Sequence, residues 1–82
     1  MFTVYVLSSV DFNKIYIGFT SNLEQRLLSH NKLGKKGWTV KFRPWTLIHT
    51  EEFLEKKDAL RREKALKTSR GRNWIRQELL LQ

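Results

Sequence analysis

The sequence predicts an α+β fold in which two strands come first and a helix, a third strand and two helices follow, in the order ββαβαα. Residues 2–8 and 14–19 are dense in β-branched and aromatic side chains, which is typical of strands. Residues 55–69 consist largely of strong helix formers. The chain has 82 residues, 40% of them hydrophobic, and one proline, which is enough apolar material for a small core. We therefore expect a single domain over residues 1–82.

The first two strands are expected to pair as a hairpin. Residues 2–8 have apolar side chains on both alternating faces, as in a strand that is covered on both sides. A polar break at residues 9–13 separates them from residues 14–19, which repeat the strand composition. Two such runs joined by a short loop indicate a β-hairpin.

A helix is expected to follow the hairpin, over about residues 22–30. Ser21 and Glu24 have the spacing of a capping box, in which each side chain satisfies an exposed backbone N–H of the first helical turn. Leu23 and Leu27 lie four residues apart and form the inner stripe of this helix.

The second half of the chain is expected to contain a loop, a strand and two helices. Residues 31–44 are rich in glycine and lysine and indicate the loop, and residues 45–53 form the third strand. The helix over residues 55–69 is expected to end at Gly71, and residues 73–81 form the last short helix. The inward-facing residues of that helix are Trp74 and Ile75.

The positive charge is concentrated in the second half of the chain. The net charge is +8, and the first 31 residues hold Lys14 and Arg26 against Asp11 and Glu24, so residues 32–82 carry 14 basic and 6 acidic side chains. Clustered cations of this kind favour a polyanionic partner, most often a nucleic acid, because binding releases phosphate counterions. The alternative is a solvated charged face that aids solubility.

Composition also excludes several classes of site. Cysteine is absent and there are two histidines, which excludes a disulfide scaffold, a thiolate nucleophile and a sulfur-ligated zinc site. The N-terminal apolar run is too short for a signal peptide, and no run approaches the length of a membrane span. We expect a soluble cytoplasmic protein.

Glu63 stands out because a carboxylate falls within an apolar helical stripe. At 100° per residue, Ala59, Leu60 and Leu66 define the core-facing side of the helix over residues 55–69, and Glu63 lies in the middle of it. One interpretation is an ion pair with Lys67 at i+4 or with a basic group across the fold. The other is a metal ligand or general base, because carboxylate oxygens suit Mg²⁺.

Arg26 and His30 lie four residues apart on the first helix and flank its apolar stripe, so both can emerge where the helix meets the sheet. They are either ordinary rim residues or functional groups. A planar guanidinium at that position is suited to the negative charge that develops during phosphoryl transfer.

Tyr5 and Tyr16 occupy corresponding places in the two strands. Both hydroxyls point to one face if the hairpin pairs residues whose numbers sum to an odd value, and to opposite faces after a one-residue slip. The sequence leaves this register open. Paired aromatics usually serve packing, but a tyrosine near a cation can also act as a base. Gly18 shares the face of Tyr16 and leaves room for a close approach.

These elements together resemble a known family. The run Thr3-Val4-Tyr5 is separated by ten residues from Tyr16-Ile17-Gly18, and Arg26 follows ten residues beyond Tyr16, with His30 four residues later. The run from residue 59 to residue 64, Ala-Leu-Arg-Arg-Glu-Lys, carries Glu63. In order and spacing these elements resemble the GIY-YIG endonuclease superfamily, and in size the chain is similar to its small stand-alone bacterial members.

The resemblance implies a three-stranded antiparallel sheet flanked by helices, and hydrolysis of DNA phosphodiester bonds with one divalent ion, Mg²⁺ or Mn²⁺. By analogy, Glu63 holds the metal and Arg26 stabilises the added charge. Tyr5 or Tyr16 orients or deprotonates the attacking water, and His30 assists near the water or the phosphate.

Three positions depart from the family pattern. Thr3 stands where the family often has glycine, at a position where the backbone matters most. Phe19 stands where the incision subunit of bacterial nucleotide-excision repair carries a lysine, so this side chain cannot bind phosphate as that lysine would. Asn73 matches no functional asparagine and is expected to cap the final helix.

The remaining basic residues suggest where a nucleic acid would lie. Lysines of the predicted loop, the outer side of the helix over residues 55–69 and the segment after it can follow a phosphate backbone, and Trp38 can stack on an unpaired base. The candidate nucleic-acid-binding residues are Lys32, Lys35, Lys36, Arg61, Lys64, Lys67, Arg70 and Arg72.

We therefore predict a metal-dependent endonuclease that acts on DNA, with branched, nicked or damaged DNA as candidate substrates in DNA repair. The chief alternative is a catalytically silent nucleic-acid-binding module that needs a partner for cleavage. A third is a basic adaptor for an acidic protein, which explains the charge but not the inward position of Glu63. A homodimer or a protein partner is left open by the sequence.

Overall fold

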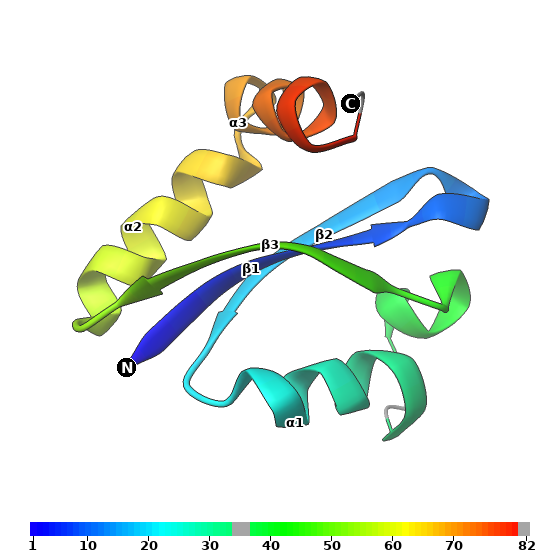
Figure 1. Ribbon diagram of the computed structural model, residues 1–82, viewed down its shortest axis with the longest axis horizontal. Helices are drawn as coiled ribbons and strands as arrows, with labels where there is room; N and C mark the ends of the chain where they lie inside the picture. Colours follow the sequence, from blue (N-terminus) through cyan, green and yellow to red (C-terminus); the bar gives the residue numbers. More distant parts are fainter. Residues whose placement is uncertain (34–36, 81–82) are drawn as a thin grey trace.

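The computed structural model describes residues 1–33 and 37–80 and has the predicted element order (Figure 1). A hairpin, a helix, a third strand and two further helices follow one another along the chain. Their bounds are β1 Phe2–Ser9, β2 Lys14–Thr20, α1 Leu23–Leu28, β3 Thr46–Phe53, α2 Lys56–Lys67 and α3 Ser69–Trp74. The three predicted strands and the order ββαβαα are confirmed.

The sheet is antiparallel, with β1 in the centre and the strand order β2-β1-β3. The hairpin pairs Tyr5 with Gly18 and Leu7 with Tyr16, so paired residue numbers sum to an odd value. Asn13 in the turn has a φ of 53°, in the left-handed region that asparagine tolerates better than most residues. This register resolves what the sequence left open: both tyrosines lie on one face.

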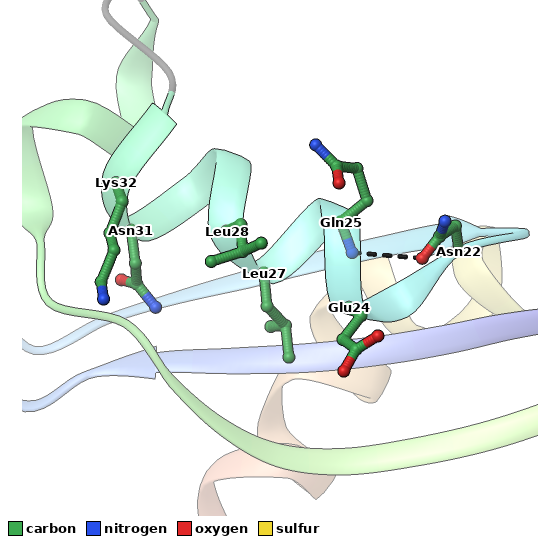
Figure 2. A pocket seen from close by; sticks show the side chains of 7 residues that line it. All are labelled: Asn22, Glu24, Gln25, Leu27, Leu28, Asn31 and Lys32. Carbon is green, nitrogen blue, oxygen red and sulfur yellow. Dashed lines mark hydrogen bonds between the residues drawn. The ribbon is translucent and has the colours of Figure 1, made fainter.

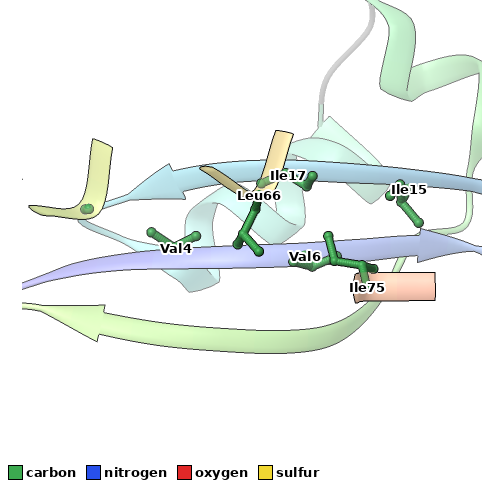
Figure 3. Packing of buried hydrophobic residues seen from close by; sticks show 7 residues of the cluster. Val4, Val6, Ile15, Ile17, Leu66 and Ile75 are labelled. Atoms are coloured by element: carbon green, nitrogen blue, oxygen red, sulfur yellow. The ribbon is translucent and has the colours of Figure 1, made fainter. Parts of the chain in front are cut away.

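The two faces of the sheet carry two separate cores. The even-numbered side chains Val4 and Val6 pack with Ile15 and Ile17 of β2 under the C-terminal helices, as Figure 3 shows. On the other face, Tyr5 and Leu7 pack with Trp45 beneath α1. In Figure 1, α2 and α3 lie on one side of the sheet and α1 on the other. Strand β1 therefore serves both cores at once.

The first helix differs from prediction at both ends. Its N-cap is Asn22, whose side chain accepts from the Gln25 N–H at 3.1 Å, so the prediction of a Ser21 capping box was wrong by one residue. Thr20 accepts from the Asn22 N–H at 3.0 Å and fixes the residue that takes the cap. Beyond Leu28 the chain continues as a π-helical turn to Leu33, which places His30 on a wider turn than an α-helix would.

The predicted loop over residues 31–44 also contains regular structure. Residues Trp38–Phe42 form a short 3₁₀ helix, which composition did not reveal. Its aromatic residues account for the difference, because Trp38 packs against Phe42 with ring centroids 4.9 Å apart and against Trp45 at 5.6 Å.

The junction of the last two helices corrects the prediction that Gly71 ends a helix. The break falls at Thr68, which has a ψ of 164°, and Gly71 lies inside α3. The Thr68 hydroxyl accepts from the Gly71 N–H at 3.1 Å and donates to the Ala65 carbonyl at 2.7 Å. A Cβ at Gly71 would lie 2.5 Å from the Leu66 Cα, so glycine is required for the close approach of α3 to α2.

Two further predictions about the last helix were partly or wholly wrong. Thr68 is the N-cap of α3, so Asn73 does not have that role. Ile75 is fully buried as predicted, but Trp74 is 38% exposed. Trp74 instead covers the side of the sheet near β3, with its ring 5.5 Å from that of His49 and beneath the Arg62 guanidinium. Within the described residues, no helix is both long and apolar enough to cross a membrane.

Candidate active site

Four of the predicted site residues lie together on the α1 face of the sheet. The Tyr5 hydroxyl and His30 Nε2 share a hydrogen bond of 2.9 Å. The ring centroids of Tyr16 and His30 are 4.6 Å apart, and those of Tyr5 and Tyr16 are 6.1 Å apart. Arg26 lies close enough for its charge to act on both Tyr5 and His30. The cluster of Tyr5, Tyr16, Arg26 and His30 is called the tyrosine–histidine cluster below.

Gly18 makes the close packing of this cluster possible. It pairs with Tyr5 across the hairpin, and a Cβ there would lie 2.7 Å from the Tyr5 hydroxyl and 3.0 Å from a ring carbon of Tyr16. Tyr5 is fully buried, and its hydroxyl is held by the hydrogen bond to His30. Glycine is therefore needed here for space beside the two phenol rings, as its position in the sequence suggested.

The backbone around His30 is held by side chains from the segment before β3. Arg43 donates to the His30 carbonyl at 2.6 Å and to the Ser29 carbonyl at 3.2 Å. Asn31 accepts from the Trp45 N–H at 2.7 Å and donates to the Trp45 carbonyl at 3.0 Å. These contacts tie the turn that carries His30 to the start of the third strand, so the imidazole is positioned by tertiary structure rather than by its own helix.

Burial keeps two members of the cluster uncharged near neutral pH. Burial raises the pKa of Tyr5, and the neighbouring Tyr16 adds to this, while the Arg26 guanidinium opposes it. Burial lowers the pKa of His30, and the positive charges of Arg26 and Arg43 lower it further. The hydrogen bond between Tyr5 and His30 thus joins a phenol to a neutral imidazole, one of whose ring nitrogens is free of a proton.

Tyr16 is more accessible than Tyr5, and its ring packs against two tryptophans. It is half-buried, and its ring stacks on that of Trp38 at 6.5 Å and meets Trp45 edge-on at 6.3 Å. Tyr16 and Trp38 also line a pocket of about 550 Å³ along the outer edge of β2, here called the β2-edge pocket. Of the two tyrosines, Tyr16 is therefore the one that meets solvent.

Glu63 lies apart from the tyrosine–histidine cluster, on the helix that covers the opposite face. Its side chain is 12% exposed, as its place in the apolar stripe of α2 predicts. It pairs with Lys67 at 3.4 Å, which is the i+4 partner that the sequence allowed. Lys67 lines the β2-edge pocket together with Tyr16, so this lysine links the carboxylate to the sheet edge where Tyr16 is reached.

The donor chemistry at Glu63 suits one hard divalent cation. A carboxylate with waters and phosphate oxygens is a common way of holding Mg²⁺, and the Lys67 ammonium shows that a cation fits beside this oxygen. Among the residues that the structure describes, no group of three or more His, Asp or Glu side chains could hold a metal by itself. A metal at Glu63 would therefore take most of its ligands from water and substrate.

The candidate nucleic-acid-binding residues occupy several surfaces. Lys67 and Arg72 line the β2-edge pocket, and Arg70 lines a groove at the junction of α2 and α3. Lys35 and Lys36 lie outside the described residues. Of the other candidates, Lys32, Arg61 and Lys64 are exposed and do not line the β2-edge pocket. Phe19, at the position of the missing lysine, packs against the core under α2.

Sequence reasoning missed three residues near the site. Lys14 and Arg76 line the β2-edge pocket, and Arg43 holds the His30 turn. Arg76 follows Arg72 at the i+4 spacing that places two side chains on one helix face, which is a signal that could have found it. Lys14 lies two residues before Tyr16 in β2, so the alternation of a strand places both on one face, and this signal could also have found it.

A second hollow, of about 400 Å³, runs along α1 and does not coincide with the cluster. Figure 2 shows its lining, from the capping residue Asn22 past Leu27 and Leu28 to Lys32. The acidic Glu24 lines this hollow together with the two leucines. None of its lining residues belongs to the tyrosine–histidine cluster, so this hollow is not part of the candidate active site.

Comparison with known proteins shows the family of this chain. The family model of the GIY-YIG catalytic domain matches residues 1–76. A UPF0213 protein of Staphylococcus haemolyticus is 38% identical over 65 residues, which cover 79% of this chain and 78% of that protein. A UPF0213 protein of Natronomonas pharaonis is 38% identical over 65 residues, covering 79% and 75% respectively. The solution NMR structure of a UPF0213 protein from Bacillus halodurans has a TM-score of 0.55 at 26% identity, and the match covers 92% of this chain and 82% of that one.

Proposed function

The chain belongs to the GIY-YIG catalytic domain family, and from this we propose that it is a metal-dependent endonuclease that hydrolyses DNA phosphodiester bonds. The observation that carries the proposal is the buried hydrogen bond between Tyr5 and His30, packed against Tyr16 and within the field of Arg26. A buried polar pair is expensive to maintain for packing alone. Its position beside an accessible tyrosine and a cation favours chemistry.

We propose different roles for the two tyrosines. Tyr5 is fully buried and burial raises its pKa, so it keeps its proton and acts as a positioning residue for His30. Tyr16 reaches solvent at the β2-edge pocket, so we assign to it the contact with the attacking water. His30 is neutral at pH 7 and adjoins the Tyr16 ring, which suits it to receive a proton as the water attacks.

Charge stabilisation comes from the two remaining residues. Arg26 is exposed on α1 beside the cluster and can approach a phosphate with a planar fork of donors. Glu63 would hold the divalent ion, which when bound supplies Lewis-acid stabilisation of the phosphate and the leaving oxygen. In hydrolysis the water oxygen bonds to phosphorus, the bond from phosphorus to the leaving oxygen breaks, and that oxygen takes up a proton.

A gel cleavage assay tests the proposal. Purified protein is incubated with Mg²⁺, Mn²⁺ or EDTA on single-stranded, duplex, nicked, flapped and four-way-junction DNA. We expect metal-dependent cutting that is lost in Glu63→Ala, and a larger loss in Tyr16→Phe than in Tyr5→Phe. Glu52→Ala is the matched control, because Glu52 is an exposed carboxylate on β3 whose removal changes the net charge equally.

The alternatives give different results in the same assay. Cutting that survives Glu63→Ala would refute the metal assignment. No cutting by the unaltered protein, with salt-sensitive DNA binding retained, would identify a silent module or one that needs a partner. The absence of both cutting and binding would favour an adaptor for an acidic protein.

A further inference from the structure

The β2-edge pocket gathers positive charge from distant parts of the chain. Lys14 comes from the hairpin, Lys67 from the end of α2, Arg72 from α3, and Arg76 from the π-helix Ile75–Leu80 that follows α3. Within the described part of the chain, none of the residues that line the pocket is acidic. Its volume of about 550 Å³ falls within the range of about 300–1,000 Å³ that is usual for small-ligand sites. A cavity of this size with four cations is suited to a compact anion.

The two arginines are held in place by the protein. Arg76 Nη1 donates to the Asn13 side-chain oxygen at 3.1 Å, across 63 residues of chain. Arg72 Nε donates to the Lys67 carbonyl at 3.2 Å. Each bond engages one of the five N–H donors of a guanidinium, so the group is oriented without using all of its donors. Oriented arginines favour bidentate contact with phosphate oxygens.

An aromatic surface borders the same pocket. Trp38 is 47% exposed, although its ring is stacked on Tyr16 and packed against Phe42 and Trp45. An indole that is held by aromatic neighbours and is still 47% exposed offers a surface on which a nucleobase can stack. Oriented arginines and an exposed indole in one cavity are the two elements that recognition of a nucleotide requires.

We propose that the β2-edge pocket binds one nucleotide, with its phosphate against Arg72 and Arg76 and its base against Trp38. The nucleotide comes either from solution, as a free monophosphate, or from a strand bound at the candidate active site. Tyr16 belongs to both the tyrosine–histidine cluster and the pocket, so a nucleotide of a strand held here adjoins the reacting phosphate. This position in a strand rests on the proposed nuclease function, whereas binding of the nucleotide does not.

A metal-free NMR titration tests the proposal. ¹⁵N-labelled protein is titrated with dAMP, deoxyadenosine, inorganic phosphate and a short single-stranded oligonucleotide, and shifts are followed at the Trp38 indole N–H and at the amides of residues 13–17 and 72–76. We expect dAMP to bind more tightly than either of its halves. The double variant Arg72→Ala/Arg76→Ala should weaken dAMP binding by about 10-fold or more, because it removes two charge-assisted donors.

Lys56→Ala is the control for general electrostatics. Lys56 is an exposed cation at the other end of α2, 11 residues or about 16 Å from Lys67, and it does not line the pocket. We expect dAMP affinity to be unchanged in this variant. The double variant should also make the salt dependence of oligonucleotide binding less steep, by about 0.7 in the log–log slope for each phosphate that the arginines no longer neutralise. Circular dichroism of each variant checks that it folds.

The outcomes separate the two proposals. The pocket would be refuted if Lys56→Ala weakened dAMP binding as much as the arginine variant does. It would also be refuted if the NMR shifts that dAMP causes were remote from the β2 edge. Binding of the oligonucleotide but not of dAMP, with the same arginine dependence, would support a nucleotide within a strand. A protein that cuts DNA but binds no nucleotide here contradicts the pocket alone, and one that binds here but never cuts contradicts the nuclease alone.

Discussion

Replacing Gly18 by alanine perturbs the tyrosine–histidine cluster by a single methyl group. The new Cβ would lie 2.7 Å from the Tyr5 hydroxyl and 2.9 Å from its Cζ, so the phenol must move by about 0.7 Å to reach an ordinary contact of about 3.4 Å. Tyr5 is fully buried and bonded to His30. Overpacking of this kind costs about 1–3 kcal/mol, which the lower flexibility of alanine in a strand offsets by about 0.5–1 kcal/mol.

We therefore expect Gly18→Ala to lower the free energy of unfolding by about 1–2 kcal/mol, measured by urea unfolding, and Tm by roughly 5–15 °C. Tyr5→Phe alone should cost about 1–3 kcal/mol, because it leaves the buried His30 nitrogen without its partner. It also removes the atom nearest to the new methyl group. In the double variant the alanine should therefore cost less, by about 1 kcal/mol.

If Gly18→Ala left the free energy of unfolding unchanged or raised it, the cluster would have room for a methyl group that the structure does not show. Additivity of the two substitutions within about 0.3 kcal/mol would show that the methyl group and the Tyr5 hydroxyl do not compete for space. Either result would refute the account of why glycine occupies this position.

Three further predictions concern stability. The pKa of His30 is lowered, so its contribution to stability is complete above the unfolded value of 6.5 and is lost as pH falls through the folded value. His30→Gln should remove this pH dependence from the free energy of unfolding, measured in urea below pH 6.5. Burial alone would raise the pKa of Glu51, but hydrogen bonds from Arg62 and His49 outweigh it, so the pKa is lowered. The free energy of unfolding should therefore fall as pH drops below 4.5. Arg62→Met should move acid unfolding to higher pH. Thr68→Ala should cost about 1 kcal/mol in thermal unfolding by removing the cap of α3, whereas Thr68→Ser should cost less; equal losses would contradict the cap.

Local chemistry in the sequence was sufficient to predict the main elements. β-branched and aromatic runs located all three strands, and helical periodicity placed Glu63 on the buried side of α2. What failed depended on packing between elements. Gly71 has the composition signal of a helix end, but its actual role is to let α3 approach Leu66, a contact that no local pattern encodes.

Only part of the candidate site could be predicted from the sequence. Tyr5, Tyr16, Arg26 and His30 could be selected from spacing, whereas the common face of the tyrosines required the hairpin register. The link between Asn13 and Arg76 spans 63 residues, so the β2-edge pocket could not be predicted from sequence. The features that the sequence did not show depend on contacts between segments that are far apart in the chain.

The central strand has a consequence for hydrogen exchange. From Val4 to Ser9 every residue of β1 is buried, and its backbone is paired on both sides while its side chains alternate between two cores. Neither core can open fully without disturbing this strand, so its central amides should exchange with the free energy of global unfolding. A ligand bound on the α1 face would then slow exchange equally at Tyr5, which faces it, and at Val4 and Val6, which face away.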